Sequence, residues 1–347
     1  MKLLESVLRA AVLDKSMPIE KRPLKIEDIA KPEPGKGQVL LKIEACGICR
    51  SNLHMIEGEW LKLGVPSKLP IIPGHEIVGR IQKVNDGDNS SQLKVGERVG
   101  VQPLFSTCGV CDYCVEGREE LCSNKKSTGE TVDGGYAEYM IADSSHVYPL
   151  PKNLKSIEAA PLFCPGVTAY SAVKKADLNP SDRVAVAGVG GVGQMVVQFA
   201  SLYGAEVIAI DNLDSHLEAS EKLGASLSIN SGKDGDIAQE LSRLGGVDKA
   251  FVFVPNTRVA SQVIKGTRAG GSIVLGAFAG IDEFPFPEEK TVIGSVIGSR
   301  ELMREVLKIA ASGRIKMLTE THNLDSANET LKDLKDGDVV SRAVLVP

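Results

Sequence analysis

Four cysteines lie close together in one short, polar stretch of the sequence: Cys108, Cys111, Cys114 and Cys122. Two-residue gaps between the first three let successive thiolates converge on one tetrahedral zinc ion, at about 2.3 Å from each sulfur. Four thiolates fill the coordination sphere, so the pattern predicts a closed, structural zinc site. In a chain without signs of export, such crowding indicates metal binding rather than disulfides.

Two alternatives remain for these cysteines. They could be unrelated core residues, or they could form a zinc ribbon that binds nucleic acid. The regular spacing argues against the first alternative. Acidic residues between and around the cysteines argue against the second, because a nucleic-acid site needs basic residues; they are Asp112, Glu116, Glu119 and Glu120.

A glycine-rich turn follows a buried strand-like run at residues 183–188 and precedes an apolar helix-like run at 192–204. It has the GxGxxG pattern of dinucleotide-binding sites. Gly188 permits the tight turn, Gly190 lets the backbone approach a pyrophosphate, and Gly193 allows close packing of helix on sheet. Gly191 opens the helix, whose N-terminus offers free N–H groups to the phosphates.

Asp211 ends the next strand-like run, at residues 206–211. A carboxylate at that place accepts hydrogen bonds from both hydroxyls of the adenosine ribose and repels a 2′-phosphate. Taken alone, Asp211 could equally be a helix N-cap or a loop residue. Together with the glycine turn, it predicts NAD rather than NADP as the cofactor.

Three further pieces of the sequence contain residues that bind metals or carry protons. Each is weak alone, since a single cysteine is usually a small core residue and a single histidine a satisfied polar residue. Spacing alone gives no reason to unite them. The pieces are Cys49-Arg50-Ser51-Asn52-Leu53-His54, Gly74-His75-Glu76 and Cys164.

The order of all these motifs resembles that of zinc-dependent medium-chain alcohol dehydrogenases. The order is GxCxSxxH, GHE, the four cysteines, an apolar-Cys-x-Gly segment, GxGxxG and a strand-end Asp, and it covers nearly the whole chain beyond a short N-terminal extension. The resemblance implies that Cys49, His75 and Cys164 hold a catalytic zinc, a Cys2His ligand set for which alcohol dehydrogenase is the standard example. It therefore implies two zinc ions per subunit.

The resemblance also implies roles for residues around the catalytic zinc. Two thiolates and a neutral imidazole leave a fourth position open for water or alcohol, whose hydroxyl then ionises near neutral pH. Ser51 and His54 resemble the relay that carries the hydroxyl proton outward through the ribose. Glu76 resembles the glutamate that approaches the zinc when water is exchanged. Without the flanking ligands, Ser51 and His54 would be read as a capping residue and a surface residue.

Other matches concern the cofactor and the substrate. Trp60, the only tryptophan, and Phe105 fall where the family has substrate-pocket aromatics. Trp60 would narrow the pocket toward small alcohols, and simple core packing is its alternative role. Residues that resemble cofactor contacts are Arg50 and Arg342 at the pyrophosphate and Thr168 and Val192 beside the nicotinamide ring.

Two positions depart from the family pattern. Asn52 stands where the family usually has an aspartate that accepts from the zinc-bound histidine. Its neutral oxygen can still accept, but it raises the basicity of the ligand less. His216 stands where a lysine often reaches the adenosine ribose, so the resemblance does not fix the exact cofactor affinity. Cys46 is not at a ligand position and is expected in the core.

Two kinds of structure must position these residues. Residues 1–150 have the pattern of short strands and turns, with strand-like runs at 39–47 and 76–84. Beyond residue 165, strands and helices alternate. The predicted strands are 183–188, 206–211, 249–254 and 271–276, and the predicted helices include 215–224 and 259–268. This alternation implies right-handed crossovers and a parallel sheet.

The predicted fold class is therefore α/β, with a doubly wound, Rossmann-type NAD-binding domain over residues 165–299. An amphipathic helix at 299–313 and a strand at 341–347 are expected to return to the first domain. The catalytic zinc-binding domain then comprises residues 1–164 and 300–347 and is discontinuous. The resemblance implies that it is mainly β and GroES-like.

The composition excludes several classes of protein. A chain of 347 residues suggests two domains, and 24% charged with 43% apolar residues is ordinary for a globular enzyme. The net charge of −5, without a basic stripe, argues against a nucleic-acid partner. No apolar run reaches the roughly 18 residues of a membrane span. Glu5 and Arg9 interrupt the apolar N-terminus, which is untypical of a signal peptide. We expect a cytoplasmic protein.

The expected activity is reversible, NAD-linked oxidation of a primary or secondary alcohol to an aldehyde or ketone. The expected assembly is a homotetramer, with a dimer as the alternative. A polyol or sugar dehydrogenase on the same scaffold is the nearest rival. A catalytically idle relative would lack zinc ligands, whereas all three are present. A zinc-ribbon interaction protein would leave residues 183–211 unexplained.

Overall fold

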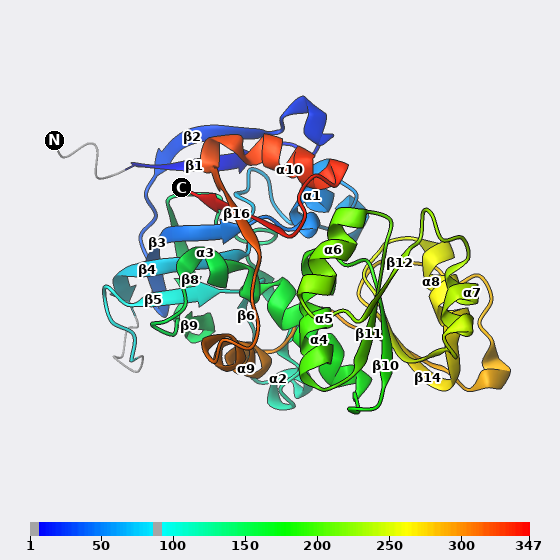
Figure 1. Cartoon of the computed structure of the whole chain (residues 1–347). Coiled ribbons are helices and arrows are strands. Elements are labelled where there is room, and N and C mark those ends of the chain that lie inside the picture. The colour runs from blue at the N-terminus through cyan, green and yellow to red at the C-terminus, as the bar shows by residue number, and fades with distance from the viewer. Residues whose placement is uncertain (1–6, 86–91) are drawn as a thin grey trace. The chain divides into compact units, whose positions relative to one another are not determined.

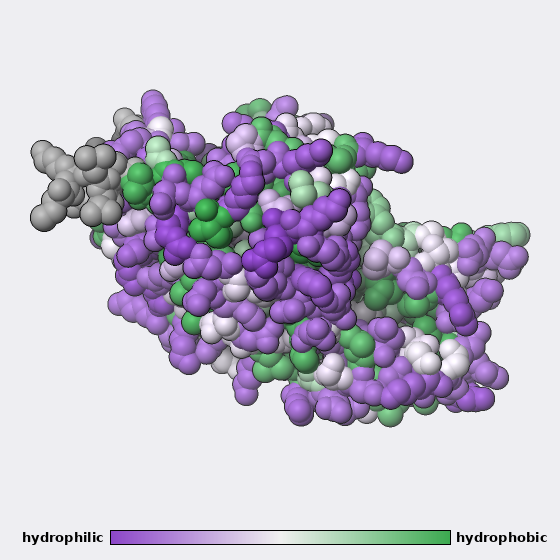
Figure 2. All heavy atoms as spheres, turned by 90° about the horizontal axis from the view of Figure 1, so that it is seen from above, coloured by the Kyte–Doolittle hydropathy of each residue, from purple (hydrophilic) through white to green (hydrophobic). Residues whose placement is uncertain are grey.

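The computed structural model describes residues 7–85 and 92–347 (Figure 1). Two compact units divide these residues. Unit one holds the described residues up to Cys164 together with Ser299–Ala311 and Met317–Pro347, and unit two holds Pro165–Gly298 and Ser312–Lys316. Within the described ranges, no helix is long and apolar enough to cross a membrane. Hydrophilic residues dominate the face shown in Figure 2, with apolar residues interspersed.

Unit one is built on a seven-stranded, mainly antiparallel sheet. Its strands run in the order β16-β17-β3-β4-β5-β9, and β8 pairs with β3. Only β16 and β17 run parallel to each other among the pairs of this sheet in the described residues. Smaller antiparallel pairs are β1 with β2 and β6 with β7. The bounds are β1 Val7–Leu13, β2 Leu24–Ala30, β3 Gln38–Gly47, β4 Glu76–Asn85, β5 Arg98–Val101, β6 Leu104–Ser106, β7 Lys126–Ser127, β8 Tyr139–Asp143, β9 Val147–Pro149, β16 Thr319–Asn323 and β17 Arg342–Val346.

The central strands β3 and β4 bring the ends of two motifs together. Their apolar residues, such as Leu41 and Ile77, are buried in one core. The register pairs Gly47, the last residue of β3, with Glu76, the first residue of β4. Because the strands are antiparallel, the chain leaves β3 and enters β4 at the same end of this pair. Cys49 and His75 therefore emerge side by side, although they are far apart in the sequence.

The helices of unit one surround this sheet (Figure 1). Helix α9 buries Met303, Val306, Leu307 and Ala310, which recur at helical spacing and form its apolar face. Helix α10 is followed by Gly337, which caps it in a left-handed backbone conformation with φ 88°. The bounds are α1 Arg50–Glu57, α2 Asp112–Val115, α3 Ser156–Ala159, α9 Arg300–Ala311 and α10 Ala327–Asp336.

Unit two is a six-stranded parallel sheet in the order β12-β11-β10-β13-β14-β15. Numbered along the chain this is the 3-2-1-4-5-6 order of a doubly wound dinucleotide-binding fold, whose ligand site lies at the carboxyl ends where the order reverses. Here the reversal lies between β10 and β13. The strands are β10 Arg183–Ala187, β11 Glu206–Asp211, β12 Leu227–Asn230, β13 Val247–Val252, β14 Thr267–Leu275 and β15 Thr291–Gly294. The helices are α4 Pro165–Ala176, α5 Gly191–Leu202, α6 Asp214–Lys222, α7 Ile237–Arg243 and α8 Thr257–Gly266.

The predicted α/β fold class with a doubly wound sheet is confirmed. The strand predicted at 249–254 corresponds to β13, which begins at Val247 and ends at Val252. Among the helices and strands that follow residue 164, six were not predicted: α4, α7, α10, β12, β15 and β16. The predicted first domain included residues 312–316, which lie in unit two. Gln198 of α5 connects these residues to unit two, since its amide binds the backbone N–H and C=O of Lys316 at 2.7 and 2.9 Å.

Candidate metal centres and cofactor site

The first candidate metal centre is formed by Cys49, His75, Glu76 and Cys164. All four are buried, and their candidate ligand atoms lie within 4.8 Å of one another. The sulfurs of Cys49 and Cys164 are 3.8 Å apart, far beyond the roughly 2.05 Å of a disulfide. Two thiolates on a tetrahedral zinc, each at about 2.3 Å, would be separated by about 3.8 Å. The spacing therefore fits two zinc ligands.

Separate elements supply these ligands. Cys49 lies just beyond β3 as the N-cap of α1, and His75 directly precedes β4. Cys164 follows the short 3-10 helix Ala160–Phe163. A hydrogen bond from Cys164, together with the positive charges of Arg342 and His75, holds the pKa of the Cys49 thiol well below its ordinary value. The hydrogen bond to Cys49 and burial raise the pKa of Cys164. The pair therefore favours one thiolate, at Cys49, and a thiolate is the form that binds a metal.

Glu76 is held by a buried ion pair with Arg342. Nε of Arg342 donates to Oε2 of Glu76 at 3.0 Å, and Nη2 donates to Oε1. Burial raises the pKa of Glu76 to about 7, although Arg342 acts in the opposite direction. Gly47 leaves room for the carboxylate, because a Cβ there would lie 2.0 Å from Oε2 of Glu76. The structure thus gives Arg342 a carboxylate partner, and its predicted pyrophosphate contact stays a prediction.

The His75 ring has polar neighbours on both sides. Its Nε2 lies 3.4 Å from Oγ of Ser51. Its Nδ1 lies 3.3 Å from Nδ2 of Asn52, whose Oδ1 accepts a hydrogen bond of 3.2 Å from the Tyr136 hydroxyl. Burial raises the pKa of Tyr136 well above its ordinary value, so it remains a neutral donor. Asn52 therefore lies beside His75, where the resemblance places an aspartate. The expected acceptance by its oxygen is not what the structure shows, because Oδ1 faces Tyr136 and the donor Nδ2 faces His75.

His54 and Ser51 both lie on α1 but have separate partners. Nδ1 of His54 is 2.7 Å from Oε2 of Glu59. The Trp60 ring packs on the His54 ring, with centroids 5.5 Å apart. Trp60 also packs against the unit-one core, which agrees with the core-packing alternative, and its predicted role in the substrate pocket stays a prediction.

Arg50 and Phe105 are also placed in unit one. The exposed Arg50 begins α1, and its Nη2 donates to the carbonyls of Leu334 and Lys335, in the last turn of α10, at 3.1 and 3.3 Å. Phe105 lies on β6 and is buried. The hydrogen bonds of Arg50 connect α1 to α10. The predicted roles of Arg50 at the pyrophosphate and Phe105 in the substrate pocket stay predictions.

The four clustered cysteines form the second candidate metal centre. Their sulfur atoms lie within 4.8 Å of one another. Three sulfur pairs are separated by 3.5 Å (Cys111 and Cys114), 3.6 Å (Cys122 and Cys108) and 3.9 Å (Cys108 and Cys114), as a tetrahedral zinc requires. Backbone N–H groups of Val110 and Cys111 lower the pKa of the Cys108 thiol to about 6. The backbone N–H of Cys114 acts to lower the pKa of the Cys111 thiol, but burial and hydrogen bonds with the other three sulfurs raise it to about 12. The convergence of the four sulfurs therefore suits this lobe, residues 108–122, to bind zinc.

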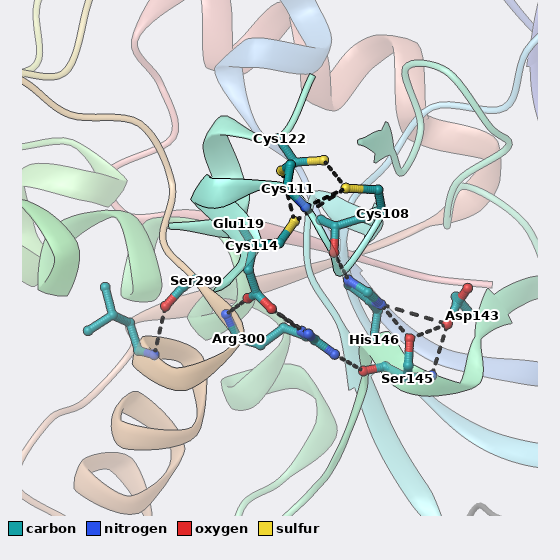
Figure 3. A network of polar contacts seen from close by, with 12 residues as sticks. Cys108, Cys111, Cys114, Glu119, Cys122, Asp143, Ser145, His146, Ser299 and Arg300 are labelled. Carbon is teal, nitrogen blue, oxygen red and sulfur yellow. Dashed lines mark hydrogen bonds and ion pairs between the residues drawn. The ribbon is translucent and has the colours of Figure 1, made fainter. Parts of the chain in front are cut away.

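A polar network joins this lobe to α9 (Figure 3). The buried carboxylate of Glu119 accepts from the backbone N–H and Nε of Arg300 at 2.9 and 2.6 Å. Arg300 also donates to the carbonyl of Ser145 at 3.1 Å. Next to it, His146 lies 3.4 Å from the Thr107 hydroxyl, beside Cys108. Glu119, one of the acidic residues of the lobe, is therefore part of an internal ion pair.

The candidate cofactor site lies in unit two at the carboxyl end of β10. Gly188 has φ +85°, a conformation that favours glycine. A Cβ on Gly193 would lie 2.1 Å from the Gly188 carbonyl oxygen, whereas a Cβ on Gly190 would meet nothing within 4 Å. Gly190 is the N-cap of α5, and Gly191 is its first residue. The structure thus has the tight turn, the open backbone and the close packing that the sequence predicts.

Asp211 closes this turn. Its Oδ2 accepts from the backbone N–H of Val189 at 2.9 Å, and its Oδ1 accepts from Asn212 and Leu213 at 2.8 and 3.1 Å. His216 lies 3.4 Å from Oδ2. Burial acts to raise the pKa of Asp211, but hydrogen bonds from His216 and the backbone outweigh it and lower the pKa. The carboxylate is therefore charged and lies at the end of β11.

Thr168 and Val192 complete the predicted cofactor residues. Both lie in unit two, Thr168 buried on α4 and Val192 half-buried in the first turn of α5. Their contact with a nicotinamide ring stays a prediction.

Three residues near the first metal centre were not singled out from the sequence. Glu59 reaches His54, and Tyr136 reaches Asn52. Burial raises the pKa of Glu130, which is close enough to His75 and Cys49 to interact electrostatically with both. The GEW context around Trp60 could have drawn attention to Glu59. Nothing in the local sequence points to Tyr136 or Glu130, because their partners are distant in the chain.

Comparisons with known proteins agree with this geometry. Residues 35–152 match the family model of the alcohol dehydrogenase GroES-like domain, and residues 191–312 match that of the zinc-binding dehydrogenases. An alcohol dehydrogenase of Geobacillus stearothermophilus is 40% identical over 97% of this chain and 99% of its own length. An NAD-dependent alcohol dehydrogenase of Sulfurisphaera tokodaii is 36% identical over 94% and 97%. The crystal structure of the Aeropyrum pernix alcohol dehydrogenase matches with a TM-score of 0.89 and 33% identity, covering 98% of this chain and 100% of that one.

Proposed function

This chain belongs to the zinc-dependent medium-chain alcohol dehydrogenase family, and we propose that it transfers a hydride reversibly between NAD and a primary or secondary alcohol. The product of alcohol oxidation is an aldehyde or a ketone. The observation that carries the proposal is the buried set of Cys49, His75 and Cys164, whose sulfurs have the separation of zinc ligands.

The three ligand side chains would hold the catalytic zinc. Bound there, zinc supplies a Lewis acid that lowers the pKa of a hydroxyl in the site to near neutrality. Two thiolates and one imidazole leave a coordination position for substrate. Asn52 would help to hold the His75 ring in place, since its Nδ2 lies 3.3 Å from Nδ1. The Glu76 carboxylate, whose charge is balanced by Arg342, lies among the ligands, which supports a role in ligand exchange.

Ser51 and His54 form the proposed proton path of the alcohol hydroxyl. The Ser51 hydroxyl lies beside Nε2 of His75, and so at the metal centre. His54 lies one turn further along α1, with a side chain that is 23% exposed. Ser51 can therefore accept the hydroxyl proton, and His54 can release it to solvent. Trp60 and Phe105 are the proposed aromatic residues of the substrate pocket.

The glycine turn and Asp211 of unit two are the proposed NAD site. The N-terminus of α5 would face the pyrophosphate with free N–H groups, and Asp211 would accept from the ribose hydroxyls. Thr168 and Val192 would contact the nicotinamide, and Arg50 and Arg342 the pyrophosphate. The four-cysteine lobe would hold a second, structural zinc.

We also propose a cytoplasmic location and a homotetramer, with a dimer as the alternative. Cysteines that serve as metal ligands must stay reduced, as they do in the cytoplasm. The family and the chain length support the tetramer.

A substrate panel tests the proposed function. Purified, zinc-loaded protein is offered small primary and secondary alcohols, polyols and sugars, each with NAD and with NADP, and cofactor reduction is followed by absorbance. The proposal predicts reduction of NAD with small alcohols and none with Cys49→Ala. A preference for polyols or sugars would favour the rival dehydrogenase. Failure to oxidise any alcohol would contradict the proposal.

A further inference from the structure

Helix α1 ends in a turn that folds the chain back over His54. Gly58 has φ +84°, and its N–H donates to the carbonyl of Met55 at 3.1 Å. The N–H of Glu59 donates to the carbonyl of His54 at 3.0 Å. These two hydrogen bonds define a Schellman motif, which brings the residue after the glycine onto the last turn of the helix. The backbone itself therefore places Glu59 next to His54.

The side chains of these two residues are also joined. Oε2 of Glu59 lies 2.7 Å from Nδ1 of His54. The Trp60 ring packs on the imidazole at a tilt of 30°. A carboxylate can only accept hydrogen bonds, so Nδ1 must carry the hydrogen. In the neutral ring, the lone pair is then on Nε2.

We propose that Glu59 is the positioning residue of the proton path. It fixes His54 as the Nδ1–H tautomer, so that Nε2 accepts the proton that leaves the alcohol hydroxyl. Nδ1 keeps its own hydrogen, and the charged ring, stabilised by the carboxylate, then releases the Nε2 proton to solvent. A carboxylate that orients a histidine base in this way is the arrangement of the serine-protease triad. The inference rests on the function proposed above, because it requires His54 to carry that proton.

A role in stability alone does not explain the contact between Glu59 and His54. Its side chain is 54% exposed, and exposed ion pairs contribute little to stability. The neighbouring Glu57 cannot replace it. The Glu57 carboxylate is already bound to the N–H of Ile19 at 3.0 Å and to Nζ of Lys335 at 2.8 Å. Glu57 is therefore a matched control at the same end of the same helix.

The kinetic test uses the full, zinc-loaded chain with NAD and a small alcohol. The alcohol is chosen so that turnover is slower with its deuterated form, because this isotope effect shows that hydride transfer limits turnover. Glu59→Ala is expected to lower kcat about tenfold, a part of the roughly 100-fold or greater contribution of general acid–base help. KM for NAD should stay within about twofold, since binding is untouched. Glu59→Asp should recover part of the rate, and Glu57→Gln should behave as wild type.

A double variant separates positioning from structure. If Glu59 acts through His54, Glu59→Ala should have no further effect on kcat in a His54→Gln background. An equal fall in kcat in both backgrounds, or an unchanged kcat in Glu59→Ala, would overturn the inference.

A spectroscopic test is independent of turnover. The chain has five histidines, and the signals of His54 in ¹⁵N-histidine-labelled protein are those lost in His54→Gln. We expect the Nδ1–H tautomer in wild type and a shift to Nε2–H in Glu59→Ala. Nε2–H in wild type would overturn the inference whatever the activity. Nδ1–H in a wild type that oxidises no alcohol would instead reject the proposed function, and with it the relay.

Discussion

Arg342 clamps the Glu76 carboxylate with two nitrogens inside unit one, and both side chains are almost completely buried. The pair connects the last strand of the chain, β17, with the first residue of β4. Removing Arg342 forces the buried Glu76 carboxyl either to stay charged without a partner or to take up a proton, and the loss of one partner of a buried pair typically costs about 3–5 kcal/mol.

Arg342→Met should therefore lower the free energy of unfolding by about 3–5 kcal/mol, measured by urea denaturation at fixed zinc. Adding Glu76→Gln should restore part of this loss, because no unpaired buried charge remains. A double variant as unstable as Arg342→Met alone would show that the loss arises from packing and not from charge.

The glycine turn offers two substitutions with opposite expected effects. Gly193→Ala places a Cβ 2.1 Å from the Gly188 carbonyl oxygen, so it should lower the melting temperature in the absence of cofactor. Gly190→Ala meets no protein atom within 4 Å and keeps an ordinary φ of −73°. It should melt like wild type and bind NAD at least about tenfold more weakly, because the methyl group lies where the pyrophosphate approaches. Calorimetric titration with NAD measures the affinity; wild-type affinity in Gly190→Ala would contradict the site.

Asp211 should determine the choice of cofactor. Asp211→Gly removes the acceptor for the ribose hydroxyls, and hydrogen bonds to a charged group contribute about 1.5–3 kcal/mol. We expect NAD to bind about tenfold or more weakly, and NADP to improve relative to NAD. Asp214→Asn, at the start of α6, is the control for loss of a nearby surface charge. A wild type that uses NADP as well as NAD would reject this role.

The four-cysteine lobe should stabilise the protein without taking part in the reaction. Cys111→Ser leaves an incomplete coordination sphere, and a structural zinc contributes folding energy directly. The variant should lose one zinc and melt at a lower temperature, or fail to assemble. Cys46→Ala is the matched control, because Cys46 is a buried cysteine outside both metal groups, and it should keep both zinc ions. Unchanged melting in zinc-depleted Cys111→Ser would count against a structural lobe.

The sequence predicted best those features that local chemistry encodes. The alternation of strands and helices predicted the parallel sheet, and the glycine turn predicted the conformations of Gly188 and Gly193. The four cysteines converge because their spacing is short. By contrast, Cys49, His75 and Cys164 could be grouped only through the family resemblance, since it is the register of β3 and β4 that brings the first two together.

Other features depend on contacts that no local pattern reveals. Strands β12 and β15 are four residues each, too short for a clear period. The partners of Glu76 and Asn52 lie in distant segments, so their pairing follows from the folded chain alone. Glu59 was detectable in principle, because Gly58 after a helix predicts a Schellman turn, but its contact with His54 required the geometry of that turn.

Zinc content per chain, measured together with NADH formation from a small alcohol, tests the central claim most directly. Wild type should contain about two zinc ions per chain and form NADH. Cys49→Ala should contain about one zinc ion, retain its fold and form no NADH, because the open catalytic site is lost while the closed lobe is kept. About one zinc ion in an active wild type, or continued NADH formation by Cys49→Ala, would contradict the account.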